Sequence, residues 1–269
     1  MDRPCILVSN DDGIQAPGLV ALAQALRAVG DVVVVAPERN WSAVGHTKTM
    51  HKPLRANQAP FAGGITAYRT SGSPSDCVAL ALLGLIKRRV DLVVSGINDG
   101  ANVGTDILYS GTFAAAAEST MFGVSAFSIS LDIGAYGNYR LPALFAVELA
   151  RKVLETPGDG PCLLNVNVPD LAGDEVARVE ITRLGQRVYQ DALVERLDPR
   201  GRRYYWIGGE APSGIVEEGT DIGALAAGRI SLTPIRLDLT DHDRMRVLRQ
   251  WSLGVGSQTV GAPKVMRDT

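Results

Sequence analysis

The amino-acid sequence predicts an α/β protein built on a doubly wound, mostly parallel sheet. Short apolar runs of strand length alternate with segments whose apolar residues recur at helical spacing, and turn residues separate the two. Continuous apolar runs are typical of parallel strands that are buried on both faces. The composition, with 46% hydrophobic and 21% charged residues, allows a sizeable core and excludes wholesale disorder.

The first unit of this alternation lies at the start of the chain. Residues 5–9 form an apolar run that ends in the turn sequence Asn10-Asp11-Asp12-Gly13, which predicts a buried strand. Pro17-Gly18 then opens a segment of helical periodicity, and residues 31–36 form a second apolar run. This β-α-β pattern predicts a right-handed crossover between parallel strands.

The same alternation continues to about residue 168. We expect further strands at 65–70, 91–95, 124–129 and 163–168, and helices at 75–86, 111–122 and 139–155. Ser73-Pro74-Ser75-Asp76 is a typical capped start for the first of these helices.

From about residue 176 the pattern changes. Antiparallel strands or an extended arm are expected at 176–183, 186–194 and 202–207, around the turn at 198–201. A short helix near 220–227, a strand at 229–234 and a helix at 241–253 complete the prediction. We therefore expect a catalytic core over 1–175, followed by an antiparallel arm and a C-terminal oligomerisation segment over 176–269.

Charge and cysteine content restrict the class of protein. The 27 basic and 29 acidic residues give a net charge of −2, so no electrostatic argument favours a nucleic-acid polymer or a membrane surface as partner. The apolar run 78–86 has about half of the roughly 20 residues that a membrane helix needs, and no signal peptide is expected. Cys5, Cys77 and Cys162 are scattered through apolar sequence, which predicts reduced thiols and a cytoplasmic location.

Three loops follow predicted parallel strands, so each is expected at the carboxyl edge of the sheet, where open α/β folds bind ligands. In the first loop, Asp11 and Asp12 are adjacent, and two neighbouring carboxylates repel each other unless a cation or several N–H donors compensate. A hard divalent cation is the simplest compensation. The alternative is that both residues only form an Asx turn and cap the helix near residue 18.

The other two loops favour the cation. Ser42 and Asn98 add a hydroxyl and an amide oxygen to the two carboxylates, a set that suits one Mg²⁺ or Mn²⁺ ion completed by water. No His and Cys cluster competes for a zinc assignment, because the histidines are only His46, His51 and His242. His46 could donate a proton to the leaving group, but a lone loop histidine is more often a plain surface or hydrogen-bonded residue, and we leave it out of the catalytic set.

The third loop also predicts an anion site. Small residues run from Asn98 to Gly104, and Ser110, Gly111 and Thr112 stand at the expected start of a helix. Free backbone N–H groups, two hydroxyls and a helix N-terminus favour a phosphate group. The simpler interpretation is that Ser110 is only a helix cap. The neighbouring metal site favours the phosphate.

Five motifs in this order resemble those of the SurE family, the stationary-phase survival proteins that are metal-dependent 5′/3′-nucleotidases. The motifs are Leu7-Val8-Ser9-Asn10-Asp11-Asp12-Gly13, Ala36-Pro37-Glu38-Arg39-Asn40 with Ser42, Ser71-Gly72-Ser73-Pro74-Ser75-Asp76-Cys77-Val78, Val94-Ser95-Gly96-Ile97-Asn98 and Tyr109-Ser110-Gly111-Thr112. The segments 165–169, 198–201 and 205–208 extend the resemblance over nearly the whole chain.

The resemblance implies metal ligands at Asp11, Asp12, Ser42 and Asn98, which are the residues that the loop argument reaches independently. It also implies a Rossmann-like core, an arm and a C-terminal segment exchanged between subunits of a homodimer or homotetramer, and release of phosphate from nucleoside monophosphates. Two positions depart from the family pattern: Phe113 stands where Val is usual, and Ser119 stands where Gly is usual.

Several mechanisms remain open at this point. We expect a metal-activated water to attack a phosphate held by Asn98, Ser110, Gly111 and Thr112, with Asp11, Asp12 and Asn98 as the catalytic residues. An aspartyl-phosphate intermediate on the first loop is the alternative chemistry. A nucleotide-binding regulator without turnover is the alternative function. A dinucleotide-dependent hydride transfer is disfavoured, because no G-x-G-x-x-G follows the first strand.

Overall fold

The computed structural model describes residues 3–156, 158–172, 177–189, 191–209, 213–251 and 253. The chain divides into two compact units, Met1–Ile235 and Arg236–Thr269. Each unit is described by itself. Residue 176, at which the predicted arm starts, and residue 252 of the last predicted helix lie outside the described residues.

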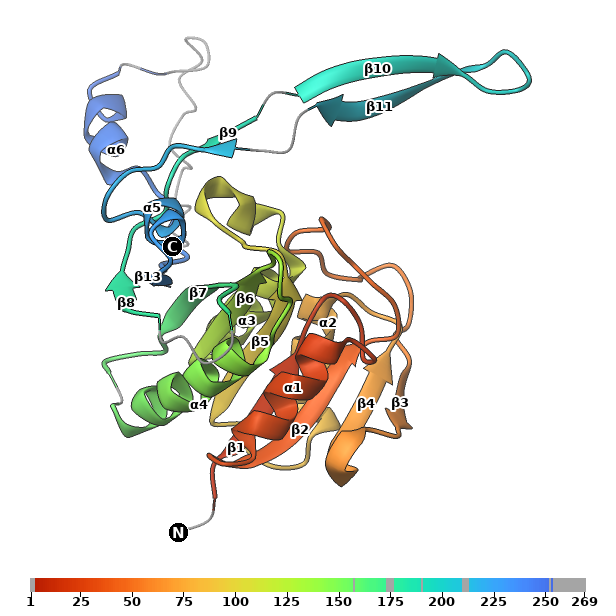
Figure 1. Cartoon of the computed structure of the whole chain (residues 1–269), viewed down its shortest axis with the longest axis vertical. Helices are drawn as coiled ribbons and strands as arrows, with labels where there is room; N and C mark the ends of the chain where they lie inside the picture. Colours follow the sequence, from red (N-terminus) through yellow and green to blue (C-terminus); the bar gives the residue numbers. More distant parts are fainter. Residues whose placement is uncertain are drawn as a thin grey trace, which may run out of the picture. The chain divides into compact units, whose positions relative to one another are not determined.

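A nine-stranded sheet forms the centre of the first unit, and Figure 1 shows helices on both of its faces. The strand order is β3-β4-β2-β1-β5-β6-β7-β13-β8. The strands are β1 (Cys5–Ser9), β2 (Asp31–Pro37), β3 (Ala56–Ala59), β4 (Thr66–Thr70), β5 (Leu92–Asp99), β6 (Ala126–Asp132), β7 (Leu163–Pro169), β8 (Val179–Ile181) and β13 (Ile230–Pro234). All neighbours from β4 to β7 are parallel, which confirms the predicted doubly wound sheet.

Four helices cover the two faces of this sheet. They are α1 (Pro17–Leu26), α2 (Pro74–Leu80), α3 (Gly111–Met121) and α4 (Arg140–Glu155). The helices α1 and α4 bury Leu19, Leu22, Ala143 and Ala146 against one face, and α2 and α3 bury Val78, Ala115 and Ala116 against the other. Two separate apolar layers therefore enclose the sheet and hold its strand ends in register.

Local sequence explains where these helices begin and end. Ser73 and Asp76 form the reciprocal capping box at the start of α2, which continues as a wider turn over Ala81–Leu85. The Ser110 side chain caps α3 by accepting the Phe113 N–H at 3.0 Å. Short 3-10 turns lie at Ala62–Gly64 (η1) and Gly104–Leu108 (η3).

The region after β7 differs from its prediction at one point. The sequence predicts an antiparallel strand or part of an extended arm at 176–183, but β8 joins the main sheet and pairs in parallel with β13. This pairing is possible because β13 returns antiparallel to β7 and offers β8 a new edge. The arm is a hairpin of β10 (Asp191–Leu197) and β11 (Arg203–Gly209), which pair antiparallel around the predicted turn.

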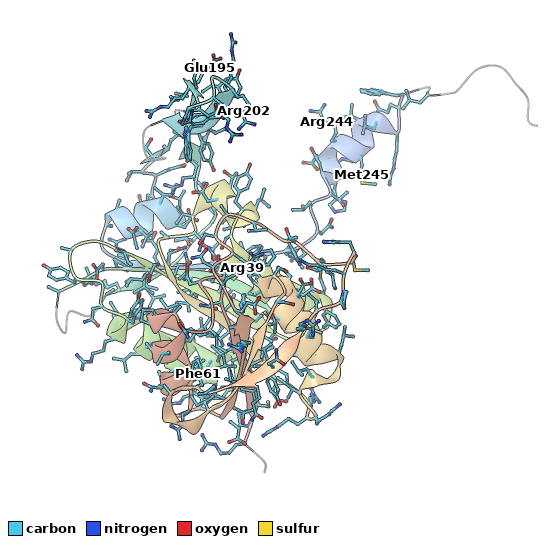
Figure 2. All side chains as sticks on the ribbon, turned by 90° about the vertical axis from the view of Figure 1, so that its right-hand side faces the viewer. Arg39, Phe61, Glu195, Arg202, Arg244 and Met245 are labelled. Carbon is cyan, nitrogen blue, oxygen red and sulfur yellow. The ribbon has the colours of Figure 1, made fainter. Side chains whose placement is uncertain are left out.

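The remaining elements of the first unit are small. A short antiparallel pair joins β9 (Arg187–Val188) to β12 (Ser213–Gly214), and the predicted short helix is α5 (Asp221–Ala226). Figure 2 shows Glu195 and Arg202 among the side chains of the β10–β11 hairpin.

The second unit contains α6 (His242–Leu248), which is shorter than the predicted helix 241–253. Its N-cap is Asp241, whose side chain accepts the Arg244 N–H at 2.7 Å. Across the described parts of both units, we find no helix with the length and apolarity that a membrane crossing requires.

Candidate metal and phosphate site

The site lies at the topological switch point of the sheet. β1 stands between β2 and β5, and Ser9 of β1 faces Ser95 of β5 in the register. β1 ends at this pair, and β5 continues beside the loop that follows β1 as far as Asp99. Ligands of open α/β sheets bind at this point, because adjacent loops diverge there and leave a crevice.

Asp11 is the more enclosed of the two carboxylates, with only 4% of its surface exposed. Its Oδ1 atom accepts a hydrogen bond from the Thr112 hydroxyl, and the backbone N–H groups of Gly111 and Thr112 also stabilise it. A Cβ atom on Gly111 would lie 2.7 Å from the Asp11 Cβ, so this approach requires glycine. Burial nevertheless raises the pKa of Asp11.

Asp12 lies nearer to solvent and accepts a hydrogen bond at Oδ1 from Asn40 at 3.2 Å. Burial, followed by the negative charges of Asp11 and Asp99, raises the pKa of Asp12 to about 6. Within the described residues, neither Asp11 nor Asp12 forms an ion pair with a basic side chain. The protein thus places two adjacent, partly desolvated carboxylates together without a cationic side chain to balance them.

The simpler interpretation of the two aspartates, as an Asx turn and a cap of the helix near residue 18, is wrong. The Asx turn is made by Asn10, whose side chain bonds the Gly13 backbone through both its oxygen and its nitrogen. The N-cap of α1 is Ala16, which has no side-chain cap. Asp11 and Asp12 therefore do not cap α1.

Ser42 reaches the same place through the loop that follows β2. The Trp41 N–H donates to the Asp11 carbonyl at 2.8 Å, and the Ser42 N–H donates to the Asn40 side chain at 2.7 Å. Because Asn40 also bonds Asp12, these contacts tie the Ser42 backbone to both aspartates. The Ser42 residue itself is exposed.

Asn98 enters from the end of β5, after an irregularity in the ladder with β6 between Gly96 and Asn98. Gly96 is required here, since a Cβ atom would lie 2.2 Å from the Ile129 carbonyl oxygen. The Asn98 Nδ2 donates to the Gly100 carbonyl at 2.7 Å, which leaves the amide oxygen as the atom that can bind a cation.

The predicted phosphate residues Ser110, Gly111 and Thr112 all lie at the N-terminus of α3, against Asp11. Two backbone N–H groups and the Thr112 hydroxyl at this end point toward the Asp11 carboxylate. The positive end of the helix thus already stabilises one predicted metal ligand, and it is the same end that would receive a phosphate.

A buried asparagine pair supports the third loop, and the sequence prediction did not include it. The Asn102 carbonyl accepts from Asn165 at 2.8 Å and from Asn167 at 3.0 Å, and the Asn102 N–H donates to Asn167 at 2.7 Å. Both β7 asparagines are completely buried. Asparagine at alternate positions of an otherwise apolar strand was the available signal, because a buried amide needs partners.

Glu118 of α3 is a second residue that the prediction missed. Its carboxylate accepts from His46 Nε2 at 2.8 Å and from Lys48 Nζ at 2.6 Å. His46 is exposed and hydrogen-bonded, as expected for a lone loop histidine, and its partner is this buried acid. The two family departures have plain packing roles: Phe113 is buried in the apolar layer, and the Ser119 hydroxyl donates to the Val124 carbonyl at 3.0 Å.

The donor set fits a hard divalent cation. Two carboxylates, one amide oxygen and one hydroxyl are ligands that Mg²⁺ and Mn²⁺ accept, with waters completing the coordination. No group of three or more His, Cys, Asp and Glu side chains in the described ranges is placed to hold a metal. The proposed ligand set contains only two such residues, Asp11 and Asp12, and its other two ligands are neutral oxygens.

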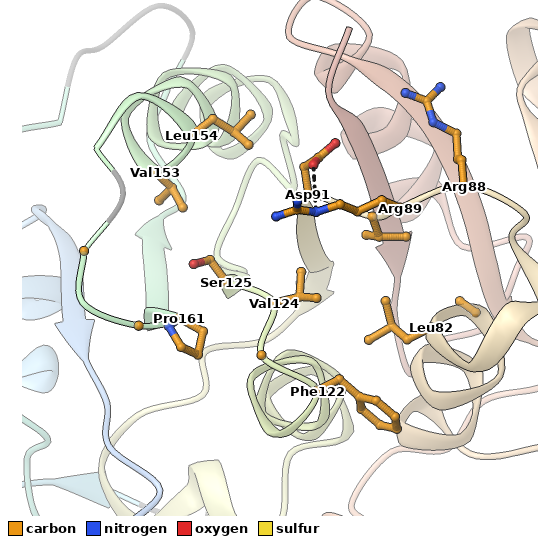
Figure 3. A pocket seen from close by; sticks show the side chains of 15 residues that line it. Leu82, Arg88, Arg89, Asp91, Phe122, Val124, Ser125, Val153, Leu154 and Pro161 are labelled. Atoms are coloured by element: carbon orange, nitrogen blue, oxygen red, sulfur yellow. Dashed lines mark ion pairs between the residues drawn. The ribbon is translucent and has the colours of Figure 1, made fainter. Parts of the chain in front are cut away.

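A cavity of about 660 Å³ lies away from this chemistry. Figure 3 shows Asp91, Ser125 and Pro161 among its lining residues, and these precede β5, β6 and β7. The cavity therefore lies at the amino ends of the strands, whereas the aspartates follow the carboxyl end of β1.

Comparisons with known proteins show which family this chain resembles over most of its length. The sequence model of a family described as "Survival protein SurE" matches residues 6–191. The protein named 5′-nucleotidase SurE from Geobacter sulfurreducens is 49% identical over 259 residues, covering 96% of this chain and 97% of that protein. Its namesake from Herpetosiphon aurantiacus is 50% identical over 240 residues, covering 88% and 94%. The crystal structure of the SurE protein from Aquifex aeolicus has a TM-score of 0.78 and 36% identity, covering 91% of this chain and 98% of that one.

Proposed function

The chain belongs to the SurE family, and on that premise we propose that it is a 5′-nucleotidase, a phosphomonoesterase that releases phosphate from nucleoside 5′-monophosphates, with 3′-monophosphates as a second substrate class. The observation that carries the proposal is the carboxylate pair Asp11 and Asp12 at the switch point of the sheet, of which Asp11 meets the N-terminus of α3. Carboxylates that can bind a cation therefore lie next to N–H donors that can bind an anion.

One Mg²⁺ or Mn²⁺ ion per subunit would be held by Asp11, Asp12, Ser42 and Asn98. A bound divalent ion supplies Lewis acidity and lowers the pKa of a water molecule, which phosphate-ester hydrolysis needs because the uncatalysed reaction is extremely slow. These four ligands suit a divalent ion that must also accept an anionic substrate. The two carboxylates supply negative charge that attracts the cation. The hydroxyl and the amide oxygen are neutral and therefore add no further repulsion toward a phosphate.

The chain's own residues have separate tasks in this proposal. Asn98, Ser110, Gly111 and Thr112 would bind the phosphate, using an amide, two hydroxyls and the donors at the start of α3. Thr112 would also hold Asp11 in place through the hydrogen bond to Oδ1. Asp11 and Asp12 are the candidates for the base that takes the proton of the attacking water.

Phosphate release from a panel of nucleoside monophosphates tests the proposal. The protein is stripped with a chelator and then supplied with Mg²⁺, Mn²⁺ or Ca²⁺. We expect release to stop on chelation and return with Mg²⁺ or Mn²⁺. Tight nucleotide binding without release would instead indicate a regulatory protein, and a phosphorylated Asp11 or Asp12 trapped during turnover would indicate an aspartyl-phosphate intermediate.

We also propose that the active protein is a homodimer or homotetramer in the cytoplasm. The exposed apolar side chains of the β10–β11 hairpin support self-association, with Trp206 62% and Ile207 84% exposed. The second unit adds exposed Leu239, Trp251 and Leu253. The three cysteines are free thiols, which fits a reducing compartment.

A further inference from the structure

Glu118 is a buried carboxylate that the proposed reaction does not use. Its side chain is 4% exposed and lies on α3, where the residues before it, Ala114 to Ala117, are buried and apolar. Glutamate is almost never buried unless it is paired. Here the partners come from a loop 70 and 72 residues earlier in the sequence: Lys48 at 2.6 Å and His46 at 2.8 Å.

The paired carboxylate is held in its charged form. Burial alone would raise the pKa of Glu118, but the hydrogen bonds from His46 and Lys48 outweigh burial, and the pKa is lowered. Lys48 also lies 5.5 Å from the centre of the Phe122 ring at the end of α3. Several contacts therefore bind this part of the loop to α3, and the neighbouring Thr47 and Thr49 are bonded to Ser73 and Asp76 at the start of α2.

The loop that Glu118 holds is the one that carries Ser42. On one side of Ser42, the Trp41 N–H is bonded to Asp11. On the other side, the Gly45 N–H donates to the Tyr109 carbonyl at 2.9 Å, directly before the start of α3. Residues 42–44 are exposed and span the gap between these two attachments. The backbone that carries Ser42 is consequently held on each side of this residue.

The helix α3 holds both Asp11 and the loop that carries Ser42. At its first turn Thr112 bonds Asp11, and two turns later Glu118 bonds His46 and Lys48. We propose that Glu118 is a positioning residue. Through its bonds to His46 and Lys48 it holds the loop that carries Ser42, and it lies on the same helix whose first turn holds Asp11. This inference rests on the proposed function, because it takes Ser42 to be a ligand of the divalent ion.

The test is a calorimetric titration of the metal-free, full-length protein with Mn²⁺, which measures binding without turnover. Glu118→Gln keeps the size of the side chain but removes its charge, and we expect roughly tenfold weaker binding, as for other residues that orient metal ligands. Glu180→Gln is the matched control, because Glu180 forms a 2.8 Å ion pair with Arg229 at the far edge of the sheet. It should bind Mn²⁺ like the wild type.

A double-mutant cycle separates positioning from general loosening. If Glu118 acts through the Ser42 loop, Glu118→Gln should weaken Mn²⁺ binding no further in a Ser42→Ala background. An equal loss in both backgrounds, or wild-type affinity in Glu118→Gln, would overturn the inference while leaving the proposed function intact. A wild-type protein that binds no Mn²⁺ would overturn both. If Glu118→Gln does not fold, the double variant His46→Asn, Lys48→Gln removes the same contacts from the side of the loop. The same Mn²⁺ titrations are then carried out on it, and the same results support or overturn the inference.

Discussion

The Thr112 hydroxyl donates a hydrogen bond to Oδ1 of Asp11, so the first turn of α3 and the loop after β1 meet in a single contact. Asp11 is a predicted metal ligand, and Thr112 is a predicted phosphate contact. The two predicted functions of the site are therefore joined through one buried pair.

We expect Thr112→Val to weaken Mn²⁺ binding and to raise the KM for nucleoside monophosphates, since valine keeps the shape of threonine but cannot donate. A loss of about 10- to 100-fold in metal affinity or activity is typical for residues that orient ligands. Thr112→Ser should retain most of both properties. Calorimetry and phosphate release measure them, and equal behaviour of the Val and Ser variants would argue against a role for the hydroxyl.

Asp11→Asn and Asp12→Asn should each abolish most activity, because each removes a charge that binds the cation. The metal-free melting temperature should not fall, since either change relieves repulsion between two unbalanced carboxylates. Thermal melts with and without Mn²⁺ check this, and the stabilisation by metal should shrink in both variants. Near wild-type turnover at limiting metal would remove that aspartate from the ligand set.

Ser42→Ala and Asn98→Ala should reduce metal affinity less than the aspartate variants do, because neutral oxygens contribute less electrostatic stabilisation to a divalent ion. Raising the Mn²⁺ concentration should partly restore the activity of Ser42→Ala. Steady-state rates over a metal titration provide the measurement. If metal affinity is unchanged in both variants and added metal restores neither, these residues act on substrate alone.

Glu118 predicts a pH dependence of stability. Its pKa in the folded protein lies below the ordinary 4.5, so its stabilising effect is present above that value and is lost as the pH falls through the folded pKa. At pH 7 we expect Glu118→Gln to lower the free energy of unfolding by about 1–2 kcal/mol. Urea denaturation of both proteins from pH 7 to about pH 3.5 should show the difference shrinking toward acid. A constant difference would mean that the charge of Glu118 is not responsible.

Removal of residues 237–269 should yield unstable or aggregating protein, because we expect this segment to pack on another subunit and cover apolar surface there. An exchanged interface of this kind would exceed the roughly 2,000 Å² that is typical of obligate contacts. Sedimentation of the full-length protein at low micromolar concentration should show a dimer or tetramer. A folded, active monomer under those conditions would exclude exchange between subunits.

The sequence by itself determined the helices and strands that depend only on neighbouring residues. The apolar run at residues 5–9 became β1, Pro17 opened α1, and Ser73 with Asp76 formed the capping box of α2. In each case the pattern and the capping residues lie within a few positions of the element that they specify. The β-α-β order then placed the loops of Asp11 and Asn98 at one edge of the sheet, which made the candidate site predictable.

Tertiary structure alone decided the features that depend on partners distant in sequence. β3 has no alternating apolar pattern and exists because β4 offers it an edge, and β8 runs parallel because β13 returns beside β7. Glu118 is the one charged residue of the sequence of α3, and the fold brings His46 and Lys48 to it. Local patterns specify which segments become strands and helices. Which side chains then meet is decided by burial, because a buried polar group must find its partner wherever the packed chain supplies one.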